Sequence, residues 1–438
     1  MGSFVPTTPS ERQQMLKTIG VGSVEELFRD VPQEMRIDGY LDLPSGKSEM
    51  ETLESVSALA EKNHVFRTCL RGAGSYRHYI PAAVKAIVNR EEFVTAYTPY
   101  QAEISQGILQ AIFEYQTMLC ELTGMDVSNA CVYDGGTAAA ESITMCRDRK
   151  RTKAYVSATT DPQVIEVMKT YCFGSDVELT VVPQKDGRTD PEALRSLLGQ
   201  DAACFYVQQP NFYGLLEEAE LLGEITHAAG AKYVMGVNPI SLAILKTPAE
   251  CGADVAVGEG QPLGLDTAFG GPYLGFMTAS SAMMRKLPGR IVGQTVDTEG
   301  ESGYVLTLSA REQHIRREKA SSNICSNEQL CAFTAAVYLS AMGEKGLRQA
   351  ATLCTSKAHY FAQQLEEKLG WKRVHPGEFF HEFVTECPDT EKALAALAKR
   401  DILGGLPVEG GILWCVTEVV TKERLDEAVA ILQEVSCG

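Results

Sequence analysis

A glycine-rich turn lies where a strand of the predicted sheet meets a helix, and its residue types suit an anion. The turn consists of Tyr133, Asp134, Gly135, Gly136 and Thr137. Glycines let the backbone approach a phosphate group, and the free amides and dipole of a helix start favour negative charge. The same residues also make an ordinary tight turn with Thr137 as the helix cap. Both interpretations stay open on this motif alone.

From about residue 130 onward, strand-like runs alternate with helical segments. The apolar runs lie at 130–133, 154–157, 177–182, 203–207, 233–237, 254–257 and 273–278. Two of the helices begin at Asp161-Pro162 and Asp190-Pro191, where aspartate can cap the helix and proline takes its first position. Repeated strand–helix units predict a mostly parallel, seven-stranded sheet that is covered on both faces.

The segments on either side of the predicted sheet are mainly helical. Ser23 and Ser48 each begin a Ser-x-x-Glu pattern, which is typical of a helix start. An apolar stripe from Ile104 to Leu122 predicts one long helix that ends at Gly124. Beyond position 326, a long helix and then short strands and helices predict an α+β unit. We expect three parts: a helical arm (1–70), a large α/β domain (71–325) and a small C-terminal domain (326–438).

Composition excludes several classes of function. The 438 residues include 57 acidic and 40 basic side chains, giving a net charge of -17, which disfavours nucleic acid as a partner. The 13 cysteines are scattered without a CxxC pair, and neither they nor the seven histidines predict a metal site. No apolar run is long enough to cross a membrane, and the N-terminus carries no evident secretory signal. We therefore expect a cytoplasmic protein without metal.

A large parallel sheet, a glycine-rich turn and a small C-terminal domain suggest the aspartate-aminotransferase-like architecture, which is fold type I of the pyridoxal-phosphate enzymes. That coenzyme needs a lysine for its Schiff base and an acid that keeps its pyridine nitrogen protonated. Asn238-Pro239 takes the place of the acid. The lysine's place reads Gly258 to Gly264, and no lysine lies between Lys246 and Lys286. The predicted fold therefore lacks both reactive groups.

Four separated motifs resemble the P-proteins of the glycine cleavage system. The first is Thr95 to Gly107, which reads TAYTPYQAEISQG, and it continues through FEYQTM and ELTGMD. The second and third are GEGQPLG at 258–264 and FGGPYLGF at 269–276. The fourth is REQHIRREKA at 311–320, followed by SNIC. The resemblance covers nearly the whole chain. Relatives often have Asp-Pro where this chain has Asn238-Pro239.

The resemblance implies an activity that needs a second polypeptide. P-proteins occur as one long chain or as two subunits, and this chain resembles the alpha subunit, whose beta partner carries pyridoxal 5'-phosphate. The family reaction decarboxylates glycine and transfers its aminomethyl group to the lipoyl arm of H-protein. Because fold type I enzymes build their sites at a subunit seam, we expect Tyr97, Tyr100 and Ser105 to contribute there. The same tyrosines also suit a turn that packs on the core.

Several cationic side chains gather in the fourth motif: Arg311, Arg316, Arg317 and Lys319. One interpretation is a contact with the beta subunit or with H-protein. The other, which charge runs favour, is a helix face where the arginines pair with Glu312 and Glu318.

Two other functions compete with this hypothesis. A self-sufficient amino-acid decarboxylase of fold type I would need a lysine between Gly258 and Gly264, and that segment has none. A scaffold subunit that only stabilises its partner is equally compatible with the sequence, because no residue pattern separates a scaffold from a contributor to a shared site.

Overall fold

The computed structural model describes residues 6–37, 39, 41–95, 99–320, 322–324 and 328–436. The chain forms two compact units, Met1–Val65 and Phe66–Gly438. The domain boundaries predicted at 70/71 and 325/326 stay predictions. None of the helices in the described segments combines the length and apolarity needed to cross a membrane.

The N-terminal unit is helical. Its helices are α1 (Pro9–Ile19) and α2 (Glu49–Ala60), with 3-10 turns at Glu25–Phe28 and Gln33–Met35. Ser48 makes the predicted capping box with Glu51, and Thr8 makes one that the sequence analysis missed. At Ser23 only a 3-10 turn follows. No described residue of these four elements is buried. Leu16 is half-buried, and their other large apolar side chains are exposed.

A seven-stranded sheet is the centre of the second unit, as predicted. Its order is β2-β10-β9-β8-β7-β3-β4. The strands are β2 (Val127–Ser128), β3 (Lys153–Ser157), β4 (Leu179–Val182), β7 (Ala202–Gln209), β8 (Lys232–Val237), β9 (Val255–Glu259) and β10 (Gly275–Ala279). β4, β3, β7, β8 and β9 pair in parallel, and β10 is antiparallel to both its neighbours.

The first strand of the sheet was predicted at the wrong place. The expected strand at 130–133 forms a single bridge, from Val132 to Gly275, and β2 lies just before it. The cause is a change of partner: the Asn129 amide donates to Met277 of β10, but the next amide, that of Ala130, donates to the carbonyl of Arg290. This turn away from β10 interrupts the ladder.

Alternating residues of the sheet contribute to two separate cores. Phe205 and Val207 of β7 pack on one face, whereas Cys204 and Tyr206 pack on the other. The first face is covered by α5 (Gln106–Thr123), α8 (Pro191–Leu197), α9 (Ala219–Ala228) and the first half of α11 (Gln329–Leu369). The second is covered by α6 (Gly135–Cys146) and α7 (Pro162–Gly174). A sheet covered on both faces explains its continuous apolar strands.

Helix starts and ends largely follow the predicted signals. The side chains of Asp161 and Asp190 cap α7 and α8, and Gly124 ends α5 in the left-handed conformation, at φ 71°. Ile104, however, precedes α5 and is 78% exposed, so the predicted apolar stripe begins too early. Shorter helices, α3 (Ala82–Val88) and α4 (Glu91–Val94), precede this region.

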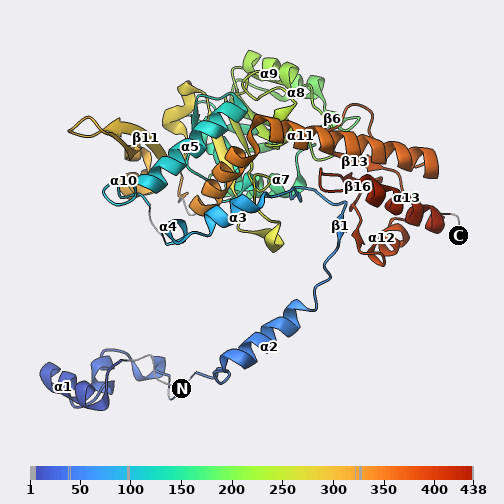
Figure 1. The fold of residues 1–438 in the computed structure, drawn as a ribbon. Helices are drawn as coiled ribbons and strands as arrows, with labels where there is room; N and C mark the ends of the chain where they lie inside the picture. The colour runs from blue at the N-terminus through green and yellow to red at the C-terminus, as the bar shows by residue number, and fades with distance from the viewer. Residues whose placement is uncertain are drawn as a thin grey trace. The chain divides into compact units, whose positions relative to one another are not determined.

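The C-terminal segments form a third core around a small antiparallel sheet, β13-β16-β15. Helix α11 kinks at Gly343 and reaches these segments, as Figure 1 shows. The other elements are β13 (Glu382–Thr385), α12 (Thr390–Ala398), β14 (Ile402–Leu403), β15 (Leu406–Val408), β16 (Gly411–Cys415) and α13 (Lys422–Ser436). The sequence analysis missed β14 and β15. β1 (Thr68–Cys69) pairs with β14 in parallel.

Two hairpins complete the fold: β5 (Gln184–Lys185) with β6 (Arg188–Thr189), and β11 (Ile291–Val296) with β12 (Ser302–Thr307).

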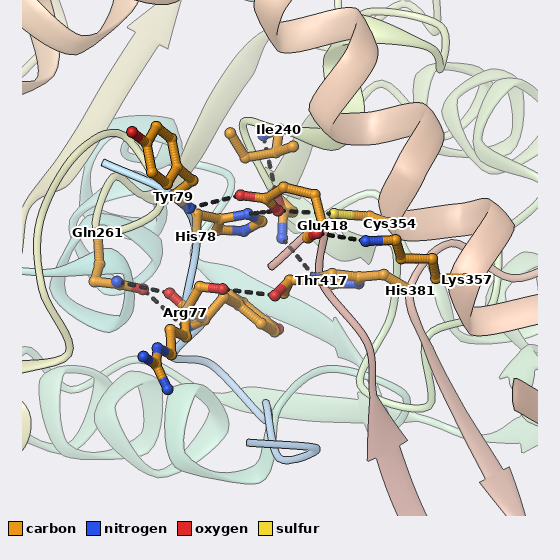
Figure 2. A network of polar contacts seen from close by, with 12 residues as sticks. Arg77, His78, Tyr79, Ile240, Gln261, Cys354, Lys357, His381, Thr417 and Glu418 are labelled. Carbon is orange, nitrogen blue, oxygen red and sulfur yellow. Dashed lines mark hydrogen bonds and ion pairs between the residues drawn. The ribbon is translucent and has the colours of Figure 1, made fainter. Parts of the chain in front are cut away.

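A polar network joins the segment after β1 to α11 and to the end of β16 (Figure 2). The Glu418 carboxylate lies at its centre, 2.7 Å from His78 Nδ1, and accepts a hydrogen bond from the Tyr79 amide at 2.6 Å. The Cys354 thiol donates to it at 3.3 Å, and Lys357 Nζ donates to the Glu418 carbonyl at 2.5 Å. Burial opposes the charged carboxylate, but hydrogen bonding and charge from His78 outweigh it and lower the pKa of Glu418.

Candidate functional site

A pocket of about 640 Å³ opens at the carboxyl ends of the central parallel strands. Gln208 lies near the end of β7, Glu259 ends β9, and Asn238 directly follows β8. The starts of α6 and α7 and the segment from Ala73 to Tyr76 supply the remaining walls. Open parallel sheets bind ligands at this edge, because the helix starts point their free amides toward it.

Amides at the start of α6 are already engaged within the chain. The Gly135 amide donates to Glu259 Oε2 at 2.9 Å, and the Thr137 amide donates to Asp134 Oδ1 at 2.7 Å. Asp134 is therefore the helix cap, where the sequence analysis considered Thr137. A side chain at Gly135 would meet Glu259 Cβ at 2.9 Å, so this approach requires glycine. Whether Gly135, Gly136 and Thr137 are a vestigial phosphate site stays a prediction, but two of the three amides have internal acceptors.

Glu259 is the last residue of β9, the strand after which a coenzyme-binding lysine is expected. Its Oε1 accepts the amides of Gln261 and Leu274 at 2.9 and 3.0 Å, in addition to the Gly135 amide on Oε2. Burial raises the pKa of Glu259 to about 7, and the nearby Asp134 carboxylate adds to the rise. The three amide donors act in the opposite direction, because they favour the charged carboxylate.

Asn238, at the position of the expected acid, has a structural partner at each end of its amide. Its Oδ1 accepts the Ile240 amide at 2.9 Å, and its Nδ2 lies 3.5 Å from His381 Nε2. Burial and the neighbouring His78 lower the pKa of His381 well below its usual value, so its ring is neutral and Nε2 can accept. Asn238 therefore stabilises the end of β8 and offers no carboxylate to a pyridine ring.

The side chains around the pocket do not fit a coenzyme that carries an aldehyde and a phosphate. No lysine, arginine or histidine occurs among the described residues that line it. Four carboxyl side chains do: Asp134, Asp161, Glu259 and Glu328. Lys246, the nearest lysine before this segment, lies at the surface and pairs with Glu220 at 2.8 Å. An imine needs an amine, and a phosphate dianion is repelled by carboxylates.

A second buried carboxyl group, that of Glu382, holds the pocket wall formed by Ala73 to Tyr76. Glu382 on β13 accepts the Ala73 amide at 2.7 Å and the Tyr76 hydroxyl at 2.8 Å. Burial raises the pKa of Glu382 to about 7. Between about pH 4.5 and 7 the native protein therefore keeps a proton that the unfolded chain releases. The free energy of unfolding falls as pH rises through this window, by about 1.4 kcal/mol per pH unit for one such group.

Replacing Glu382 with glutamine is expected to flatten this pH dependence. The variant has no carboxyl proton to lose, so wild type should lose about 3 kcal/mol more stability than Glu382→Gln between pH 4.5 and 7. Urea unfolding at a series of pH values measures the difference, and Glu427→Gln, at the partly exposed Arg424 pair, is the control. Parallel curves for wild type and Glu382→Gln would contradict the assignment.

The predicted seam segment is described only in part. Tyr97 lies outside the described residues. The Tyr100 ring lies beneath the Arg290 guanidinium, whose Cζ is 4.1 Å from the ring centroid. Arg290 also pairs with Glu312, with Nη1 3.4 Å from Oε2. Ser105 immediately precedes α5 but makes no side-chain capping bond.

The four cationic residues of the fourth motif do not form one helix face. Ser309–Arg311 and Arg317–Lys319 are 3-10 turns, and only Gln313–Arg316 between them is α-helical. Arg311 is half-buried and donates to the carbonyls of Leu287 and Gly289. Arg316 donates to the Ala310 carbonyl at 3.2 Å, and the chain at Arg317 has a φ of 53°. Glu312 pairs with Arg290 instead of with its predicted neighbours.

Sequence reasoning missed the role of Glu259, although a signal for it was present. The residue was considered only as part of a segment without lysine. An acidic residue between two glycines, directly after a buried strand, is unusual enough to question, because a carboxylate there must find donors. The donors on Gly135 and Leu274 are distant in sequence, so their identity could not be inferred.

Comparisons with known proteins identify the family of this chain. A family model described as glycine cleavage system P-protein matches residues 2–432. The chain belongs to this family. Probable glycine dehydrogenase (decarboxylating) subunit 1 of Desulfitobacterium hafniense, a P-protein relative, is 47% identical over 444 residues, covering 99% of this chain and 100% of that protein.

Solved structures confirm the fold prediction. A crystal structure of glycine decarboxylase (P-protein) of the glycine cleavage system, in inhibitor-bound form, matches with a TM-score of 0.91 and 42% identity, covering 99% of this chain and 100% of that one. An aspartate aminotransferase of Thermus thermophilus matches with a TM-score of 0.58 at 14% identity, covering 84% of this chain and 99% of its own. This P-protein chain therefore has the fold of type I pyridoxal-phosphate enzymes.

Proposed function

We propose that this chain is the alpha subunit of a glycine decarboxylase, which acts only together with a beta subunit. Three observations support this proposal: membership of the P-protein family, relatives named subunit 1 that match over almost their whole length, and a pocket whose described lining residues include no amine. The activity is decarboxylation of glycine and transfer of the aminomethyl group to the lipoyl arm of H-protein. Glycine and H-protein enter this proposal from the family alone, and the cytoplasmic location stays a prediction from the sequence.

The coenzyme, in this proposal, is held by the beta subunit. Pyridoxal phosphate supplies an electron sink for the decarboxylation, and it needs a lysine to be held covalently. The pocket of this chain offers four carboxyl groups and no cation among its described lining residues. This observation carries the proposal, and it also argues against a self-sufficient decarboxylase.

The Tyr100 segment is the best-supported contribution of this chain to a shared site. The ring of Tyr100 is held in place by Arg290, which in turn is held by Glu312. The side chains of Arg290 and Glu312 are only 21% and 10% exposed, so the support is rigid. Arg290 and Arg311 each keep a buried Nε–H without an acceptor in the described part of the chain.

Tyr100→Phe in the assembled complex is expected to lower the rate of glycine–bicarbonate exchange. The substitution keeps the ring on Arg290 but removes the hydroxyl, and losing one well-placed donor near a reacting group costs on the order of tenfold or more. Tyr304→Phe, on the nearby hairpin, is the control, since Tyr304 packs on Phe113.

Size-exclusion chromatography must show that both variants still assemble with the beta subunit. Exchange at the wild-type rate by an intact Tyr100→Phe complex would remove this segment from the site. In that case the scaffold function remains the better account of the chain.

A further inference from the structure

Three hydrogen bonds from backbone amides hold the Glu259 side chain beside the pocket. Three backbone amides from three separate segments converge on one point: Gly135 at the start of α6, Gln261 after β9, and Leu274 before β10. Their distances to the Glu259 oxygens are 2.9, 2.9 and 3.0 Å. Converging amides at a helix start are the usual donors to a phosphate group.

The occupant of this cradle of amides is a side chain of the protein. We propose that the Glu259 carboxylate takes the place of a bound phosphate group at the start of α6, and that it keeps phosphate esters out of the pocket. It acts in two ways. It uses the amides that a phosphate needs, and together with Asp134, which accepts the Thr137 amide at 2.7 Å, it places two carboxyl groups where the ligand's own negative charge would lie.

This role gives the Glu259 carboxyl group a structural purpose at the wall of the pocket. Without it, the amides of Gly135, Gln261 and Leu274 would lose their acceptor, and an unsatisfied buried donor destabilises the fold. The pocket thus remains open, at about 640 Å³, although its phosphate cradle is filled. The missing lysine prevents covalent attachment of an aldehyde, whereas Glu259 prevents the prior, non-covalent step of phosphate binding.

The prediction concerns phosphate binding by the full-length chain. At pH 8, replacing sodium chloride with inorganic phosphate of equal ionic strength should raise the unfolding temperature of wild type only by the general stabilising effect of phosphate, and binding is scored as the rise beyond that. Glu259→Ala vacates the cradle, and its unfolding temperature should rise by about 2 °C when phosphate reaches ten times its dissociation constant. Pyridoxine 5'-phosphate, which has no aldehyde, should bind the variant and not wild type in a phosphorus NMR titration.

Two controls make the test specific. Glu217→Ala removes another buried carboxylate, one that accepts from Thr159, Thr189 and Asn211 outside the pocket. It should gain no response to phosphate, and an equal gain there would overturn the assignment to the cradle. If the alanine variant does not fold, Glu259→Ser replaces it. Serine is smaller than glutamate, but its hydroxyl can still accept a hydrogen bond from one amide.

Two further results would overturn the proposal. One is saturable binding of pyridoxine 5'-phosphate to wild type, which can be measured whether or not any variant folds. The other is a folded Glu259→Ala or Glu259→Ser chain that binds phosphate no better than wild type. Because no readout involves catalysis, failure here is distinguishable from failure of the proposed glycine decarboxylase function.

Discussion

Replacing Glu418 with alanine is expected to lower the free energy of unfolding by about 3 to 5 kcal/mol. The substitution leaves His78 Nδ1, the Tyr79 amide and the Cys354 thiol without their acceptor. The side chain of His78 is 2% exposed and that of Glu418 is 10% exposed, so water cannot replace the lost hydrogen bonds fully. Urea unfolding at pH 7, followed by circular dichroism, measures the loss.

Glu427→Ala is the matched control for this substitution. Glu427 pairs with Arg424 at 2.6 Å, but both side chains are about 40% exposed (41% and 39%), and such surface pairs contribute about 0 to 1 kcal/mol. A similar loss for the two variants would contradict the view that the His78–Glu418 contact holds the C-terminal elements to the segment that lines the pocket.

Catalysis is expected to depend completely on the beta subunit. With pyridoxal phosphate added, this chain alone should give no visible absorbance band of bound coenzyme and no glycine–bicarbonate exchange, because its pocket has no amine among the described lining residues. Mixing the two subunits should restore exchange, and the two chains should co-purify. Glycine–bicarbonate exchange by this chain alone, free of the beta subunit, would contradict this dependence and would place a coenzyme-binding lysine on this chain.

The sequence predicted the sheet well because each strand carries its own signal. Runs such as 203–207 and 233–237 are apolar throughout, which is typical of strands buried on both faces. Aspartate–proline pairs mark the starts of α7 and α8. The loss of the coenzyme lysine could also be inferred, because an absent residue type is visible without a structure. The short edge strand Val127–Ser128 was misplaced, because hydrogen bonds to Met277 and Arg290 decide where it ends.

The candidate site was predictable only in outline. Gly135 and Glu259 are 124 positions apart, and their hydrogen bond depends on how closely α6 approaches the end of β9. His78, Cys354 and Glu418 come from three separate segments, yet their polar atoms lie within 4.8 Å of one another. Local patterns contain no information on such distances. The prediction that the arginines of the fourth motif share one helix face was wrong for a related reason. The helix expected there is broken into short turns.

The coenzyme's position in the assembled complex tests the central claim most directly. Borohydride reduction of the complex with pyridoxal phosphate, followed by peptide mass spectrometry, fixes the coenzyme to whichever lysine holds it. We predict one modified lysine on the beta subunit and none on this chain, not even Lys246 or Lys286. A stoichiometric phosphopyridoxyl group on any lysine of this chain would contradict the account.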